Sequence, residues 1–165
     1  MIKKILIALA IVLVLIQFIR PAKNDAGGVV YSMPTGYNVP PEVNVILKPA
    51  CLDCHSNVTH YPWYSNIQPA AWFLANHVKE GKEHLNFSEF TNRRIAYQHH
   101  KFEEIVEMVK EKEMPLPSYT WFGLHPDAKL TDAERETLII WAQSQMAMIA
   151  AKYPEQRPTN DAHFV

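Results

Sequence analysis

The first twenty residues hold the longest apolar run of the chain. Lys3 and Lys4 precede unbroken apolar positions over residues 5–16, and Arg20 follows. About 19 residues would rise ~28 Å as a helix, close to the ~30 Å apolar thickness of a bilayer. A short positive region before such a run is typical of export signals. The pattern predicts an uncleaved signal anchor over residues 1–20, with the lysines on the cytoplasmic side; a cleaved signal peptide is the alternative.

The rest of the chain alternates helical periods with proline-rich connections and shows no strand period of useful length. Residues 21–40 are rich in Gly, Pro, Asn and Asp, which predicts a flexible tether. One domain is then expected over residues 41–153, followed by a polar, loose tail over residues 154–165. The helices expected in this domain cover residues 41–47, residues 70–78 with a stop at Gly81, residues 92–112, and a last stretch that Thr131 begins and Pro154 ends.

The two longest expected helices have clear apolar faces at helical spacing. Thr131 and Glu134 also have the spacing of a capping box at the start of the last helix. We therefore predict an all-α domain in which these two faces are buried. The face positions are Ile95, Phe102, Ile105, Val106 and Val109 in the first helix and Leu138, Ile139, Trp141, Ala142, Met146 and Ile149 in the second.

The composition indicates a globular protein but no particular function. The 165 residues are 48% hydrophobic and 20% charged, a globular balance with room for one domain of ordinary size. The formal net charge of −1 gives no reason to expect nucleic-acid binding.

The chemistry of the chain is concentrated at its only two cysteines. Cys51 and Cys54 are two residues apart, and His55 follows directly. This spacing is typical of a covalent c-type haem site, in which two thiols take up the haem vinyl groups and the histidine ligates the iron on the proximal side. The alternatives are a structural disulfide, a thioredoxin-like redox pair and a zinc site. Each lacks support, because the loop is very small, no strand–helix–strand pattern surrounds it, and no second cysteine pair exists.

A six-coordinate haem needs a second axial ligand, and Met114 is the favoured candidate. It stands at a helix end and precedes Pro115, on a stiff loop that can present a thioether to iron. Met108, Met146 and Met148 lie in expected helices, where packing is the usual role of methionine.

A second histidine is the main competitor for this axial position. Methionine raises the haem potential relative to a second histidine, so the two arrangements differ in function. The histidines that remain as candidates are His60, His77, His84, His99 and His100.

The order of these features resembles a small class I cytochrome c, in which the first and last helices cross and a Met-Pro loop supplies the sixth ligand. Three segments are also similar to the bacterial haem-binding domain family: Cys-His-Ser-Asn at residues 54–57, Tyr-Pro-Trp-Tyr at residues 61–64, and Ile-Gln-Pro-Ala at residues 67–70. Members are small exported proteins, some attached to cytochrome c or cytochrome c peroxidase modules. The resemblance covers residues 41–153 and implies haem c binding and electron transfer.

We therefore expect a monohaem c-type cytochrome that transfers single electrons, an electron carrier rather than an enzyme. Its expected location is the inner membrane, with the domain facing the periplasm and redox proteins of the envelope as partners. Tyr61, Trp63 and Tyr64 are expected to line the haem pocket or a docking face. An open or histidine-occupied distal site would instead favour a haem-based sensor or a peroxidase-like protein. An exported zinc or thiol–disulfide module is a third hypothesis.

Overall fold

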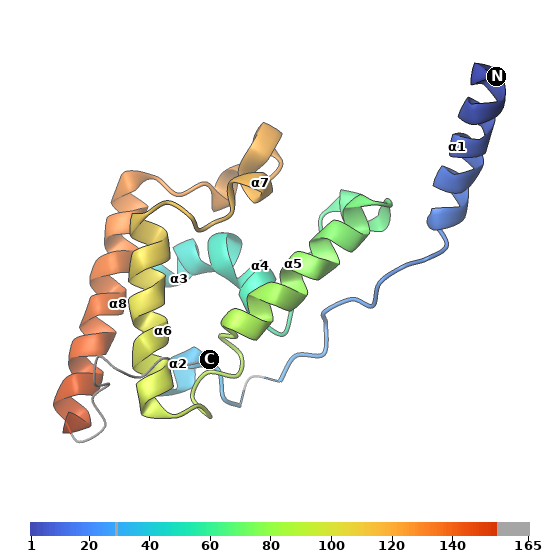
Figure 1. Ribbon diagram of the computed structural model, residues 1–165. Helices are drawn as coiled ribbons and strands as arrows, with labels where there is room; N and C mark the ends of the chain where they lie inside the picture. The colour runs from blue at the N-terminus through green and yellow to red at the C-terminus, as the bar shows by residue number, and fades with distance from the viewer. Residues whose placement is uncertain (29, 155–165) are drawn as a thin grey trace.

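The protein is built from helices joined by extended segments and short turns (Figure 1). This computed structural model describes residues 1–28 and 30–154. Within them, the β pairing consists of an isolated bridge between Tyr31 and Glu89. The all-α prediction is therefore confirmed. Apart from Pro154, the predicted polar tail lies outside the described residues.

The N-terminal helix α1 (Ile2–Ile16) stands apart from the other helices in Figure 1, and none of its residues is buried. It is shorter than the stretch through residue 19 that the apolar pattern predicts. The chain leaves the helix after Ile16 because the next N–H groups bond only three residues back. Among the described residues, no helix combines the length and the apolar character required to cross a membrane.

The cysteine motif lies on one continuous helical segment. Helix α3 (Pro41–Leu47) passes into a π-helical turn (Lys48–Leu52), and α4 (Asp53–His55) follows directly. The sequence predicted an end near Pro49. The wider i→i+5 spacing of a π-turn relieves the contact between a proline ring and the preceding turn, so the chain stays helical through this residue.

Helix α5 (Ala70–His84) packs against α4 and continues through Gly81, where the sequence predicted a stop. A Cβ at Gly81 would lie 2.9 Å from the carbonyl oxygen of Cys54 and 3.3 Å from its Cβ. Close packing against the motif thus requires a residue without a side chain. This contact outweighs the ~1 kcal/mol that glycine costs in a helix interior.

Helices α6 (Ile95–Lys110) and α8 (Asp132–Lys152) lie side by side and antiparallel (Figure 1). Their predicted apolar faces meet in the core, although Ile95, Val106, Ile139 and Met146 are only partly buried there. Helix α3 packs against α8, as the cytochrome resemblance implies for the first and last helices. The buried positions of both faces are Phe102, Ile105, Val109, Leu138, Trp141, Ala142 and Ile149.

Residues 31–37 belong to the folded domain, although the composition of residues 21–40 predicted a flexible tether. Met33 begins the short helix α2 (Met33–Gly36) and is only 1% exposed. The ring of Tyr37 packs edge-to-face against Phe90 and Phe102. These contacts are made with residues more than fifty positions away in the sequence, so no local periodicity predicts them.

The segment between α6 and α8 folds back over the cysteine motif. It contains the short helix α7 (Pro117–Thr120) and two 3₁₀ turns, Trp121–Gly123 and Pro126–Ala128. The second of these turns contacts the π-turn that carries Cys51. The long loop therefore covers the motif rather than extending into solvent.

Candidate haem site

Cys51 and Cys54 are unpaired and partly buried. Burial raises the pKa of Cys51 to about 12, and the nearby Cys54 adds to this shift. Burial also raises the pKa of Cys54 to about 11, helped by the Asp53 carboxylate. Both thiols are thus protonated at neutral pH. Thiol–disulfide exchange requires a thiolate, so these cysteines are poorly suited to that chemistry.

The His55 ring is held by the end of α5. Its Nδ1 lies 3.0 Å from the carbonyl oxygen of Leu85. A carbonyl only accepts, so Nδ1 carries the proton and Nε2 keeps the lone pair that a metal requires. Burial lowers the pKa of His55, although hydrogen bonds to the Leu85 and Gly81 backbone oppose this shift, and the lowered pKa favours the neutral, ligating imidazole.

Asp53, inside the motif, joins three parts of the chain. One carboxylate oxygen accepts from the Tyr119 hydroxyl at 2.9 Å, and the other accepts from the backbone N–H of His60 at 3.0 Å. Its carbonyl oxygen accepts from the Thr59 hydroxyl at 2.6 Å. The side chain is 15% exposed. The motif is therefore bonded both to the loop that follows it and to the loop before α8.

Two tyrosines and a histidine continue this network. The Tyr119 ring stacks on His125 with 3.9 Å between ring centroids and 13° between planes. The Tyr64 hydroxyl lies 2.6 Å from Nε2 of His125. Burial lowers the pKa of His125 and raises the pKa values of both tyrosines. Tyr64 therefore keeps its proton and donates a hydrogen bond to Nε2 of neutral His125.

The three aromatic residues expected at the pocket separate in the structure. Tyr64 joins the network over the motif, whereas the Tyr61 hydroxyl accepts from the backbone N–H of Asn24 at 2.6 Å, against the N-terminal segment. Trp63 is largely exposed. The sequence missed Asp53, Tyr119 and His125, because a carboxylate inside the motif and two residues of a proline-rich loop carry no periodic signal.

Met114 is held in place through its own peptide groups. Its N–H donates to the carbonyl of Met108 at 3.2 Å. The Arg135 guanidinium, from α8, donates to the carbonyl oxygens of Met114 and Val109, each at 2.9 Å. The residue is partly buried at the start of the loop that Tyr119 bonds to Asp53. Its backbone is thus fixed between α6 and α8.

The other histidines have individual partners. His60 contacts Asp53, and Nδ1 of His77 lies 2.8 Å from the carbonyl oxygen of Phe73. His100 pairs with Glu103 and Glu104 on its own helix. The described residues contain no group of three or more His, Cys, Asp or Glu side chains arranged to hold a metal ion. A haem iron differs from such a metal because only its axial ligands come from the protein.

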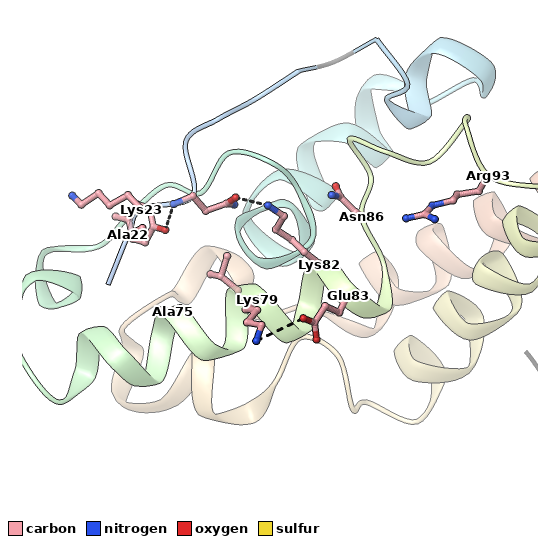
Figure 2. A pocket seen from close by; sticks show the side chains of 11 residues that line it. Ala22, Lys23, Ala75, Lys79, Lys82, Glu83, Asn86 and Arg93 are labelled. Atoms are coloured by element: carbon pink, nitrogen blue, oxygen red, sulfur yellow. Dashed lines mark hydrogen bonds and ion pairs between the residues drawn. The ribbon is translucent and has the colours of Figure 1, made fainter. Parts of the chain in front are cut away.

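A second feature is a basic hollow of about 600 Å³ between residues 22–24 and α5 (Figure 2). Lys82 crosses it to the side-chain oxygen of Asn24 at 2.6 Å, and Lys79 pairs with Glu83 at 3.9 Å. One carboxylate thus faces four cations. The charged residues of this basic hollow are Lys23, Lys79, Lys82, Glu83 and Arg93.

A family model described as the haem-binding domain matches residues 11–144. The chain belongs to the haem-binding domain family. No curated protein and no solved structure matches it. The match confirms the family that the residues around the motif indicated, and with it that this protein binds haem.

In this haem-binding domain the residues present fit the cofactor. The two thiols and the imidazole share one helical segment, and the Leu85 carbonyl selects the ligating tautomer of His55. The backbone of α5 is brought against Cys54 at Gly81. Cys51, Cys54 and His55 are therefore the residues that would hold haem.

Proposed function

We propose that this haem-binding domain is a monohaem c-type cytochrome that carries single electrons. Cys51 and Cys54 attach the haem, and His55 is the proximal ligand. The bond between Nδ1 of His55 and the Leu85 carbonyl carries the proposal, because it fixes the ring orientation and basicity that a proximal ligand requires. The haem supplies the one-electron chemistry, while the protein sets its potential and access.

Met114 is the proposed distal ligand. Its peptide is bonded on both sides, and the loop beyond it is bonded to the motif through Tyr119 and Asp53. A loop bonded at these two points resists movement, which would keep the reorganisation small when a bound haem changes oxidation state.

The proposed location is the cell envelope, with attachment to the inner membrane through the N-terminal segment and the domain on the periplasmic side. Lys3 and Lys4 before the apolar residues of α1 support export in this orientation. Exported chains are also those in which c-type haem is normally attached, and redox proteins of the envelope are the proposed partners.

A haem-based sensor or peroxidase-like protein with a histidine at the distal position is the second candidate. His99 favours it. Its side chain is 12% exposed, and Nδ1 lies 3.4 Å from the Glu103 carboxylate without hydrogen-bond geometry. Of the histidines expected as alternative ligands, it is therefore the first to test.

Covalent attachment is tested with the double variant Cys51→Ser, Cys54→Ser, expressed as the full chain with a cytochrome c maturation system. Haem staining after denaturing electrophoresis should detect haem in the wild type and none in the variant, since serine forms no thioether. A variant that keeps its full content of covalent haem would falsify the proposal.

The distal ligand is tested with Met114→Ala, with Met108→Ala as the matched control. Because methionine raises the haem potential, its loss should lower the midpoint by on the order of 0.1–0.2 V, within the ~0.8 V that axial ligands cover. The weak methionine–iron band at the red edge of the spectrum should disappear, and the ferrous protein should bind carbon monoxide. If the untreated wild type binds carbon monoxide, the distal site is open and Met114 is not the ligand. If Met114→Ala leaves the spectrum and midpoint unchanged and binds no carbon monoxide, His99→Ala becomes the informative variant.

A further inference from the structure

Four apolar side chains lie exposed at the start of α5 and in the 3₁₀ turn before it (Trp63–Asn66). The exposed fractions are 72% for Trp63, 59% for Phe73, 47% for Ile67 and 37% for Trp72. The turn and the helix pack against each other, so these residues lie on neighbouring parts of the fold. We call Trp63, Ile67, Trp72 and Phe73 the aromatic face.

Gln68 and Trp72, at the aromatic face, are hydrogen-bonded to the residues that follow α1. The side-chain amide of Gln17 donates to the Gln68 carbonyl at 3.3 Å, and its oxygen accepts from the Gln68 N–H at 2.9 Å. The carbonyl oxygen of Ile19 accepts from the Gln68 side chain at 2.7 Å and from the Trp72 indole N–H at 3.1 Å. These four hydrogen bonds place the point where α1 ends beside the start of α5 (Figure 1).

Helix α1 leaves its apolar side chains uncovered on every side. Its Ile, Leu and Val residues from Ile2 to Leu15 are each more than half exposed. Burial of one such side chain is worth ~1.5–3 kcal/mol, so a helix of this kind is stable only in apolar surroundings. The hydrogen bonds that Gln17 and Ile19 make with Gln68 and Trp72 would then hold the aromatic face at the border of the apolar layer around α1.

Cations lie behind the aromatic face along α5. Lys79 follows Trp72 by seven residues, which is ~10 Å along the helix, and each headgroup layer of a bilayer is ~5–8 Å thick. Arg20 and Lys23 lie four and seven residues after the end of α1, and Lys23 lines the basic hollow. Indole rings at the boundary of the hydrocarbon and cations near the phosphates are the arrangement that lipid interfaces favour.

We propose that the aromatic face lies in the headgroup region of a bilayer containing anionic lipid, with the basic hollow turned toward the lipid phosphates. This inference rests on the proposed attachment of α1 to the membrane. It adds that the domain itself has a second lipid contact, which fixes the orientation of the haem relative to the membrane.

The test uses the full haem-loaded chain in vesicles of phosphatidylcholine and phosphatidylglycerol that contain a headgroup-photoreactive phosphatidylcholine. After illumination, crosslinked peptides are mapped by mass spectrometry. Peptides covering residues 62–74 should carry several times more lipid than peptides covering residues 138–150 of α8. Lipid on α1 alone, or crosslinks between residues 62–74 of two copies, would overturn the second contact. Protein that does not float with the vesicles would refute the membrane attachment instead.

Orientation is measured by linear dichroism of the haem band in aligned bilayers. The double variant Trp63→Gln, Phe73→Gln should lose most of the dichroism of the wild type while keeping its vesicle binding and haem content. Ile140→Gln, which changes an exposed apolar residue on α8, is the matched control and should keep the dichroism. Equal dichroism in wild type and double variant overturns the proposal.

Discussion

The hydrogen bond from the Tyr119 hydroxyl to Asp53 joins the loop after α6 to the cysteine motif through side chains. A hydrogen bond to a charged acceptor is worth ~1.5–3 kcal/mol when it is sheltered, and Asp53 is 15% exposed. No pattern in the sequence predicted Tyr119 or Asp53 as a site residue. Their partnership spans 66 positions, and only the folded chain brings them within hydrogen-bond distance.

Tyr119→Phe removes this bond and leaves the ring that stacks on His125. We expect the free energy of unfolding to fall by ~1–2 kcal/mol, and the haem site to become more accessible because the loop is held less firmly. Urea unfolding and the rate of carbon monoxide binding to the ferrous protein measure the two effects. Tyr97→Phe is the control, since the Tyr97 hydroxyl makes an exposed bond of 3.3 Å to a backbone carbonyl. Equal losses in the two variants would contradict a special role for Tyr119.

At the scale of elements, α8 begins where the sequence predicts because its start signal is local. The N–H of Glu134 donates to the Thr131 hydroxyl at 3.2 Å, and the Glu134 carboxylate accepts from the Thr131 N–H at 2.8 Å. The capping box is thus confirmed. Helix α5 shows the opposite case, because the packing at Gly81 extends a helix past its local stop signal.

Thr131→Ala should lower the free energy of unfolding by ~1 kcal/mol, since the helix loses its N-cap. Thr137→Ala, at a partly buried position inside the same helix, is the control and should cost less. Thermal unfolding followed by circular dichroism compares them. A larger loss in Thr137→Ala would contradict the capping role.

The capping box of Thr131 and Glu134 also predicts how the free energy of unfolding depends on pH. Hydrogen bonds from the Thr131 backbone and side chain hold the pKa of Glu134 below its ordinary value of 4.5. A carboxylate with a lowered folded-state pKa stabilises the fold above its unfolded pKa and ceases to do so as pH falls through the folded value. In Glu134→Gln the loss of stability on acidification below about pH 4.5 should therefore be smaller than in the wild type.

At the scale of the whole molecule, the core is assembled from α3, α6 and α8 together with residues that lie before the predicted domain. Met33 and Phe102 are among the largest fully buried side chains. The indole N–H of Trp141, from α8, donates to the carbonyl of Asn38 at 2.9 Å. Residues 31–40 therefore belong to the same packed unit as α8.

Met33→Ala should destabilise the protein by ~2–5 kcal/mol, the usual cost of a large-to-small change at a buried site. Met148→Ala, at an exposed position on α8, is the matched control and should cost much less. Denaturant unfolding of both variants measures the two losses in the free energy of unfolding. Equal stability of Met33→Ala and the wild type would show that residues 31–37 act only as a tether.

The sequence by itself determined the features that depend on neighbouring residues: the Cys51, Cys54 and His55 spacing, the apolar faces of α6 and α8, and the cap at Thr131. Each is a local pattern, fixed by a few consecutive positions. Tertiary structure decided the Leu85 bond that selects the tautomer of His55, the run of α5 through Gly81, and the burial of Met33. These depend on groups 27 to 54 positions apart that only the packed chain brings together.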